Sequence, residues 1–342
     1  RAEEIQTCLA CNQACLDRLC SRRAATCLVN PRACRETVAP LRMAQRARTV
    51  AVVGAGPAGL ACAVTAAERG HQVTLFEKEG DIGGQFRLAR LIPGKEEFAE
   101  TLRYYRVRLE RLGVTLRLGM SPRAEELLSF DEIVIACGVA PREVHLPGGD
   151  KALVLRYPEV ISGARPVGRR VAIIGAGGIG FDMAAFLLHE RREPQSVAEF
   201  MATWGVDMDY RGEGGLQDEQ AGQAGRSIYL LQRSSGKPGA GLGKTTGWIH
   251  RALLKRHGVK MMAGVEYVEV VDEGLRIRHE GREQLLAVDN VVLCAGQVSE
   301  TGPAAALDRL GRPCHLIGGA LKAGEIDAKR AIREGTELAD RL

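Results

Sequence analysis

Apolar and polar positions alternate in blocks that predict strands and helices joined by glycine-rich turns. A buried strand at Val50–Val53 is followed by such a turn, by an apolar helix from about Pro57 to Arg69, and by a second strand at Gln72–Phe76. The uncharged run from Thr49 to Ala67 is about long enough to span a bilayer. Its glycines and its proline divide it into strand, turn and helix, so we expect a βαβ unit and no membrane segment.

The same block pattern returns further along the chain. Residues 169–188 predict a strand, a glycine turn and a helix, and the next strand is expected at Ser227–Arg233. Residues 190–226 between them are rich in Gly, Gln and acids, and a loop of that length without clear structure is usually functional. Strands ending in small residues are expected within Phe130–Arg142 and Val288–Gln297, and the tail from His315 predicts a strand, a Gly-Gly turn and a helix. This order predicts an α/β protein with two Rossmann-like dinucleotide-binding domains.

Composition narrows the class of protein further. The 342 residues suffice for two or three domains, and only 4% are aromatic, which is typical of α/β nucleotide-binding proteins. The 47 basic and 42 acidic residues are spread along the chain, which does not favour a nucleic-acid partner. The first residues, "RAEEIQTC", carry charges and no apolar core, so we expect no signal peptide and a reducing, cytoplasmic location.

Cysteines are concentrated near the N-terminus, with six of the ten between Cys8 and Cys34. Three thiols within eight residues, and a fourth further along, suit a 4Fe-4S cluster. A zinc site more often shows two separated C-x2-C pairs, and unligated thiols are the other alternative. Cys20 and Cys34 are surplus to either site and are expected to be buried apolar or exposed thiols. The candidate metal ligands are Cys8, Cys11, Cys15 and Cys27.

Glycine spacing predicts where dinucleotides bind. A G-x-G-x-x-G pattern needs its first glycine for a tight turn, its second for close approach of a pyrophosphate, and its third for packing of helix on strand. The free amides at the start of the following helix then face the phosphates. The chain carries this pattern twice, at Gly54, Gly56 and Gly59 and at Gly175, Gly177 and Gly180.

The residues after each second strand distinguish the two sites. Glu77 ends the strand of the first unit, where a carboxylate takes ribose hydroxyls, and the following "GDIGGQF" resembles the FAD-binding subset of these folds. The alternative for Gly83 and Gly84 is an ordinary turn. The second unit instead has Arg233 near its strand end, and Arg pairs with a 2'-phosphate, which favours NADP. A solvated Arg beside an NAD site is the alternative.

The runs "CNQACLD", "VVGAGPAGL", "AIIGAGGIGFD", "GLGKTTGWIHR" and "HLIGG" together resemble the C-terminal half of the bacterial NADPH-dependent 2,4-dienoyl-CoA reductase family. This family belongs to the iron-sulfur flavoenzymes that include trimethylamine dehydrogenase. The resemblance implies that NADPH gives a hydride to FAD and that electrons pass singly through the 4Fe-4S cluster to FMN. FMN would lie in an N-terminal (β/α)8 barrel that reduces dienoyl-CoA in fatty acid β-oxidation. This chain has no such barrel, so FMN and dienoyl-CoA are expected only with it, and a contact with it is implied.

On this resemblance the expected domains are a cluster segment at 1–45, an FAD domain at 46–165 with a return segment at 291–342, and an NADPH domain at 166–290. No catalytic acid or base is assigned, because hydride transfer between the cofactors needs none. One alternative is a stand-alone NADPH oxidoreductase similar to the small subunit of glutamate synthase, which donates to a partner protein. Another is a binding module that holds ADP or has an inert second site. Further cofactor-binding candidates are Pro57, Ala58, Lys78, Gly84, Gln85, Gly138, Lys244, Gly296, Gly318, Gly319 and Asp327.

Overall fold

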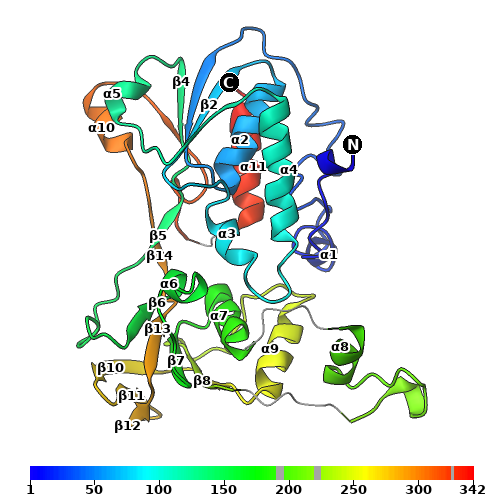
Figure 1. Ribbon diagram of the computed structural model, residues 1–342, viewed down its shortest axis with the longest axis vertical. Helices are drawn as coiled ribbons and strands as arrows, with labels where there is room; N and C mark the ends of the chain where they lie inside the picture. Colours follow the sequence, from blue (N-terminus) through cyan, green and yellow to red (C-terminus); the bar gives the residue numbers. More distant parts are fainter. Residues whose placement is uncertain (190–195, 219–224, 325–326) are drawn as a thin grey trace. The chain divides into compact units, whose positions relative to one another are not determined.

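The chain folds into two compact units in a computed structural model that describes residues 1–189, 196–218, 225–324 and 327–342 (Figure 1). The first unit comprises residues 1–142, 243–246 and 296–342, and the second comprises residues 143–242 and 247–295. The sequence placed the boundaries between the two dinucleotide domains at 165 and 290, whereas the units divide after residues 142 and 295. Residues 143–165 pack with the second unit because their strand β6 (Val154–Arg156) pairs with β13 (Asn290–Leu293).

A five-stranded parallel sheet forms the centre of the first unit. Its strand order is β15-β4-β1-β2-β3, which places β1 in the middle with buried residues from Val50 onward. β1 and β2 are the strands expected from the sequence, and β2 runs one residue further, to Glu77. The strands are β1 (Thr49–Val53), β2 (Gln72–Glu77), β3 (Thr115–Leu118), β4 (Glu132–Ile135) and β15 (His315–Leu316).

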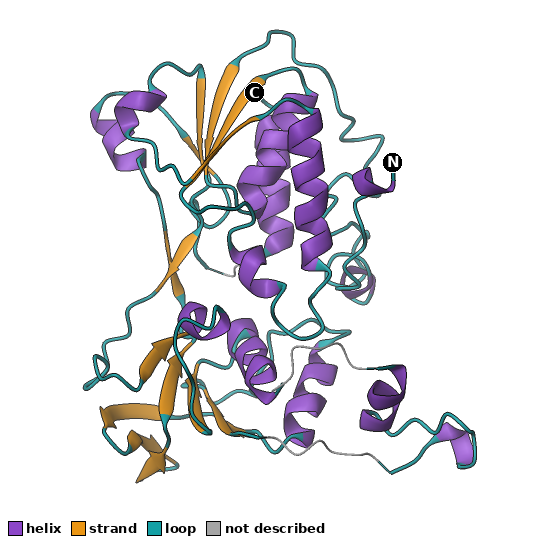
Figure 2. Cartoon of the chain, in the orientation of Figure 1, coloured by secondary structure: helices purple, strands orange, loops and turns teal. Residues whose placement is uncertain are grey.

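Three helices of the first unit lie side by side, α2 (Pro57–Glu68), α4 (Phe98–Arg111) and α11 (Ala328–Ala339) (Figures 1 and 2). α2 is built mostly from small apolar residues, which lets α11 approach its backbone. A Cβ on Gly335 of α11 would lie 2.2 Å from the carbonyl oxygen of Ala58, so only glycine fits there. Shorter helices follow at α3 (Gln85–Ala89), α5 (Ala124–Leu127) and α10 (Ala304–Arg309).

The second unit repeats this plan with a parallel sheet of order β6-β13-β7-β8-β9. Its strands β7 (Arg170–Ile174) and β8 (Ser227–Leu231) flank a helix α7 (Gly178–Leu188), and β9 (Lys260–Met262) follows α9 (Gly247–Arg256). β8 ends two residues before the end expected from the sequence, which leaves Gln232 and Arg233 in a loop. An antiparallel meander and a short helix complete the unit: β10 (Glu266–Val271), β11 (Gly274–His279), β12 (Arg282–Ala287) and α6 (Tyr157–Ile161).

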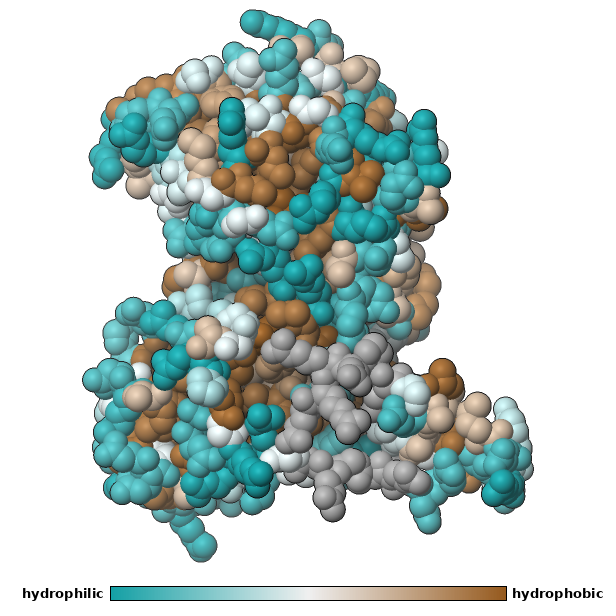
Figure 3. Space-filling view, viewed as in Figure 1, coloured by the Kyte–Doolittle hydropathy of each residue, from teal (hydrophilic) through white to brown (hydrophobic). Residues whose placement is uncertain are grey.

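The segment between α7 and β8 is more ordered than the sequence pattern indicated. Within its described part, 196–218, a helix α8 (Val197–Thr203) and a short turn η2 (Glu213–Gly215) form, and Val206 bridges to Leu216. α8 begins with a capping box, in which Ser196 and Glu199 exchange side-chain and backbone hydrogen bonds. Apolar side chains reach the surface over α8 (Figure 3), among them Val197 and Phe200.

No helix in the described ranges combines the length and the apolar character needed to cross a bilayer. This agrees with the expectation that Thr49–Ala67 forms a strand, a turn and a helix rather than a membrane segment.

Candidate functional sites: two glycine crevices and a cysteine loop

Four small-residue loops of the first unit meet where the strands of its sheet end. A Cβ on Gly54 would lie 2.4 Å from the oxygen of Ala136, which follows β4, and one on Gly84 would lie 3.0 Å from the Cα of Gly56. A Cβ on Gly319 would lie 2.8 Å from the carbonyl carbon of Gly138. The "GDIGGQF" loop, the turn after β4 and the Gly-Gly turn of the tail are therefore packed against the first glycine turn. Ligands of parallel α/β sheets bind at this edge.

The glycines of the first turn divide into two kinds. A Cβ on Gly59 would lie 1.9 Å from the carbonyl oxygen of Gly54, so this glycine allows α2 to pack on the end of β1. Nothing lies within 4 Å of the position of a Cβ on Gly56. The space in front of Gly56 is open, as close approach of a pyrophosphate requires. Pro57 starts α2 and Ala58 is buried behind it, so both lie at the helix N-terminus.

Glu77 is buried at the end of β2 and binds the glycine turn. Its Oε2 accepts a hydrogen bond of 2.8 Å from the N–H of Ala55, and its Oε1 accepts one of 3.0 Å from the N–H of Glu79. A carboxylate offers about four acceptor positions, so these two hydrogen bonds do not use all of them. The sequence pattern located the acid but not its bond to the turn. Lys78 is exposed directly after it.

The tail contributes residues to the same crevice. A Cβ on Gly318 would lie 2.8 Å from the Cβ of Ala58, next to the start of α2. Asp327 is the N-cap of α11, where its side chain accepts a 2.9 Å hydrogen bond from the N–H of Lys329. Asp327 therefore caps this helix. Glu325 lies outside the described residues, and Gln85 opens α3 beside Gly84.

The second unit repeats the first glycine turn closely. A Cβ on Gly180 would lie 1.8 Å from the oxygen of Gly175, nothing lies within 4 Å of a Cβ position on Gly177, and Gly175 has a φ of 112°. The N–H of Gly175 donates to Leu231 at 2.9 Å, as the N–H of Gly54 donates to Phe76 at 2.8 Å. Both glycine crevices therefore have the space and the backbone geometry for a dinucleotide.

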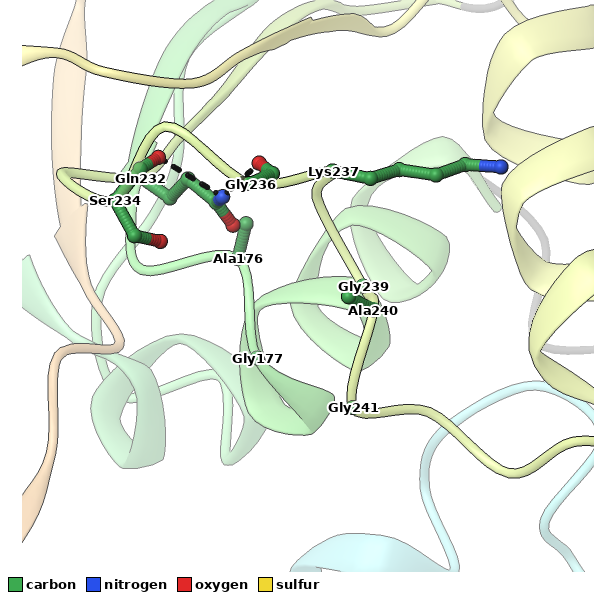
Figure 4. A pocket seen from close by; sticks show the side chains of 9 residues that line it. All are labelled: Ala176, Gly177, Gln232, Ser234, Gly236, Lys237, Gly239, Ala240 and Gly241. Atoms are coloured by element: carbon green, nitrogen blue, oxygen red, sulfur yellow. Dashed lines mark hydrogen bonds between the residues drawn. The ribbon is translucent and has the colours of Figure 1, made fainter.

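A cavity of about 370 Å³ opens beside this second turn (Figure 4). The amide of Gln232 shapes its rim, since Nε2 donates to the oxygens of Ser234, at 3.0 Å, and Gly236. The loop carrying these oxygens returns to the turn, where the N–H of Gly239 donates to Ala176 at 3.2 Å. The glycine-rich run "SSGKPGAGLG" was the sequence signal for this wall, which our sequence reasoning missed. The lining residues are Ala176, Gly177, Gln232, Ser234, Gly236, Lys237, Gly239, Ala240 and Gly241.

The remaining candidate residues after β8 and near β14 lie in different surroundings. Arg233 is exposed beside Tyr267, whose pKa burial raises to about 12 while the Arg233 charge opposes the shift. Lys237 lines the cavity, and its extended side chain points away from Gln232 (Figure 4). Lys244 is exposed on the segment 243–246, which packs with the first unit. Gly296 lies against the guanidinium of Arg142, beside the antiparallel pair β5 (Val139–Pro141) and β14 (Gln297–Ser299).

The four candidate ligand cysteines lie near one another. Burial raises the pKa of the Cys11 thiol, the N–H of Gln13 opposes this, and Cys27, Cys15 and Cys8 raise the pKa further. A second amide, that of Ala10, donates to the Sγ of Cys8 at 3.4 Å. Left-handed backbone at Ala10 and at Asn12, with φ of 51° and 57°, turns the chain within this loop.

The cysteine segment is fixed to the first unit by apolar and ionic contacts. Leu28 and Val29 are buried in the core formed with α2, α4 and α11, and each such side chain contributes about 1.5–3 kcal/mol. Around them, Arg32 pairs with Asp340 at 2.6 Å and Arg103 donates to the oxygen of Ile5 at 3.0 Å. Partly exposed ion pairs contribute about 0–1 kcal/mol, so the buried residues dominate the anchoring.

The donor set of this loop is four thiols with backbone N–H groups close to two of them. Thiols approached by backbone N–H groups suit a cluster whose sulfurs accept hydrogen bonds. In the described ranges no three His, Cys, Asp or Glu side chains converge tightly enough for one metal ion. Four zinc ligands at about 2.3 Å would need such convergence. Cys20 and Cys34 are exposed, and all ten cysteines are free thiols.

Comparison with known proteins identifies the fold. The model of the pyridine nucleotide-disulphide oxidoreductase family matches residues 48–319. A metal reductase from Desulforamulus reducens is 30% identical over 95% of this chain and 48% of its own length. A cinnamate reductase from Clostridium sporogenes is 28% identical over 87% of this chain and 40% of its own.

A solved structure of 2-naphthoyl-CoA reductase with 2-naphthoyl-CoA superposes with a TM-score of 0.83 and 28% identity. The superposition covers all of this chain and 47% of the naphthoyl-CoA reductase chain. The chain thus spans about half the length, or less, of these relatives. The relatives named here are reductases, and the chain shares their Rossmann-like oxidoreductase fold. The chain belongs to the pyridine nucleotide-disulphide oxidoreductase family, which implies FAD and a nicotinamide nucleotide as cofactors.

Proposed function

We propose that this chain oxidises NADPH in its second unit, reduces FAD in its first, and passes the electrons outward through a 4Fe-4S cluster. The observation that carries the proposal is the grouping of Cys8, Cys15 and Cys27 around Cys11 on the same unit as the Gly54–Gly59 crevice. When bound, FAD supplies two-electron chemistry toward NADPH and one-electron chemistry toward the cluster.

The residues of the first unit bind and orient FAD. The open space at Gly56 and the amides at the start of α2 suit the pyrophosphate. The lone pairs of the Glu77 carboxylate that do not accept backbone hydrogen bonds suit the ribose hydroxyls. Gly138 and Gly319 bring two more backbone turns to this edge without side chains to obstruct a ring. No side chain has to hold or move a proton, since hydride transfer between the cofactors requires position alone.

NADPH is preferred over NADH in this proposal because of the residues after β8. Gln232 stands where Glu77 stands in the first unit, so no carboxylate repels a 2'-phosphate there. The exposed cations Arg233 and Lys237 flank the loop that forms the cavity wall. Either one pairs with a phosphate by reorienting a long side chain.

The final acceptor proposed is a conjugated acyl-CoA, of the dienoyl-CoA type used in fatty acid β-oxidation, reached through an FMN barrel. Relatives named for cinnamate and 2-naphthoyl-CoA reduce or bind unsaturated acyl compounds of this kind, and they are about twice as long as this chain. A reducing cytoplasm would keep the cysteines available for the cluster.

A second candidate function is a stand-alone NADPH oxidoreductase that donates to a partner protein. It is favoured by the 36% identity, over 40% of this chain, to the small chain of an NADPH glutamate synthase from Mycobacterium tuberculosis. Detection of a separate protein that accepts electrons from this chain would favour this function over electron transfer to an FMN barrel.

The test is an anaerobic NADPH titration of protein reconstituted with FAD, iron and sulfide. We expect the flavin absorbance to bleach and an EPR signal of a reduced cluster to appear. If the flavin absorbance bleaches but no EPR signal of a reduced cluster appears, the proposed electron transfer from FAD to the cluster is contradicted. If the flavin does not respond, the second unit is an inert or ADP-binding site and the protein is a binding module.

A further inference from the structure

The segment Gly243–Thr246 connects two regions with separate expected roles. It packs with the first unit, although the residues on both sides of it belong to the second. Its contact there is a double hydrogen bond to Asp17: the N–H of Thr245 donates to Oδ1 at 2.8 Å, and the hydroxyl of Thr245 donates to the same oxygen at 2.7 Å. The proposed function leaves this part of the "GLGKTTG" motif without a role.

Asp17 is built into the cysteine loop. It follows Cys15 in the short helix α1 (Leu16–Leu19), its N–H donates to the oxygen of Asn12 at 3.0 Å, and its own carbonyl accepts from Ser21 at 2.7 Å. These bonds fix its backbone between candidate cluster ligands. A Cβ on Gly243 would lie 2.6 Å from Oδ2, so the motif needs glycine at this point for the carboxylate to fit.

The residues shortly before Gly243–Thr246 line the cavity beside the second glycine turn. Ser234 and the loop from Gly236 to Gly241 line that cavity. Gly239 is held by its bond to Ala176 and by a hydrogen bond of 3.0 Å from Arg251 to its oxygen. Thr245 is four positions after Gly241, so this stretch spans at most about 14 Å when fully extended. The cavity wall and the hydrogen bonds to Asp17 therefore belong to one short stretch of chain.

We infer that Asp17 and Thr245 couple nucleotide binding in the cavity to the cysteine loop. The inference rests on the proposed function, because it requires a nucleotide in the cavity and a cluster on the loop. Both are positioning residues, since neither lines the cavity nor belongs to the four candidate ligands. Coupling between two sites is reciprocal: if NADP+ binding changes the cluster loop, the cluster changes the affinity for NADP+ by the same factor.

The experiment measures the Kd of NADP+ by calorimetry for protein loaded with FAD, with and without the cluster. NADP+ is used because it delivers no electrons. We expect the two Kd values to differ about fivefold, at the lower end of measured couplings between sites. The difference should disappear in Thr245→Val, which loses the hydroxyl donor, and in Asp17→Ala, which loses the acceptor, and return in Thr245→Ser, which keeps the hydroxyl.

Thr246→Val is the matched control, since it makes the same change one residue along, where no bond to Asp17 exists in the described structure. Flavin content and melting temperature check that each variant folds. If the wild-type protein binds NADP+ and holds its cluster, but the two Kd values agree, the coupling is overturned and the proposed function stands. If Thr245→Val and Thr246→Val behave alike, the contact is only structural and the inference also fails. A wild-type protein that takes up no cluster, or no NADP+, overturns both proposals.

Discussion

The two glycine turns have the same backbone but differ in the side chain that follows the second strand. In each unit the N–H of the first glycine donates to a carbonyl of the neighbouring strand, that of Phe76 at 2.8 Å and that of Leu231 at 2.9 Å. In the first unit Glu77 then binds the N–H of Ala55 and closes onto the turn. In the second, Gln232 turns away to hold the oxygens of Ser234 and Gly236.

This difference separates what the fold requires from what ligand choice requires. The first and third glycines are common to both units because the packing of strand, turn and helix leaves no room for a side chain there, whereas the space in front of the second glycine is open in both. The hydrogen bonds described for the strand-end side chains go to backbone groups near their own crevice, so the two units carry different side chains there on the same glycine turn. An acid there fixes the turn and offers acceptors to ribose, whereas an amide fixes the cavity wall and leaves room for a phosphate.

The largest effect is expected from alanine at the third glycine of each turn. Gly59→Ala and Gly180→Ala place a methyl 1.9 or 1.8 Å from a carbonyl oxygen, which is well inside contact distance. Such overpacking costs about 1–3 kcal/mol or more, so we expect each variant to lower the melting temperature of its own unit and to lose that unit's ligand. Flavin content and NADP+ binding report the two units separately.

Gly56→Ala and Gly177→Ala are the matched controls, because nothing of the protein lies within 4 Å of the added methyl. They should keep the melting temperature and weaken only the ligand. If Gly59→Ala binds FAD as the wild type does, the assignment of this glycine to packing is wrong.

A carboxylate in the second unit should reverse its nucleotide preference. Gln232→Glu places a negative charge near the 2'-phosphate, and we expect KM for NADPH to rise by on the order of tenfold, about 1.4 kcal/mol, with KM for NADH little changed. Steady-state kinetics with both nucleotides measure this. Lys237→Ala should act in the same direction. A wild-type preference for NADH would contradict the prediction from the start.

Removing the negative charge of Glu77 in the first unit is expected to weaken FAD binding. Glu77→Gln keeps an acceptor oxygen for the N–H of Ala55 but loses charge-assisted bonds to ribose, which contribute about 1.5–3 kcal/mol. Flavin retained after dialysis should fall by roughly tenfold or more, at a melting temperature close to that of the wild-type apoprotein. A melting temperature that falls as far as in Glu77→Ala would show that the carboxylate mainly supports the fold.

Local patterns allowed most of this fold to be predicted, because they reflect local causes. The glycine spacing, the first apolar strands and the start of α2 at Pro57 follow from steric needs within about 30 residues, and the structure confirms them. The capping box at Ser196 is also local, and it would have predicted α8 within a segment that we expected to lack clear structure.

Contacts between distant residues could not be predicted in this way. The bond of Asp17 to Thr245 joins positions 228 residues apart, and neither residue has a neighbour in sequence that indicates the other. The same holds for the four loops that meet at Gly56 and Gly138, each of which was found as a separate small-residue turn. Only the topology of the sheet, which orders β15 next to β4 and β4 next to β1, brings them together.

The smallest effect concerns the residue that enters the second strand of each unit, His71 in the first and Arg226 in the second. Burial lowers the pKa of His71, with Arg69 and Arg48 adding to the shift and Glu132 opposing it. Its Nδ1 accepts from the N–H of Arg48 at 3.2 Å, a bond that protonation removes.

The unfolded chain binds this proton near pH 6.5 and the folded unit only below that, so stability is full above about pH 6.5 and is lost as pH falls through the lower, folded pKa. At the corresponding place in the second unit, Arg226 donates to the carbonyl oxygens of Gly168, at 3.1 Å, and Leu187, at 3.0 Å. Melting curves at pH 7.5 and 5.5, followed by flavin release, should therefore show a loss of stability on acidification that is smaller in His71→Asn. An equal loss in the variant would place the pH sensitivity elsewhere, and the two strand entries would then not differ in the way that their side chains indicate.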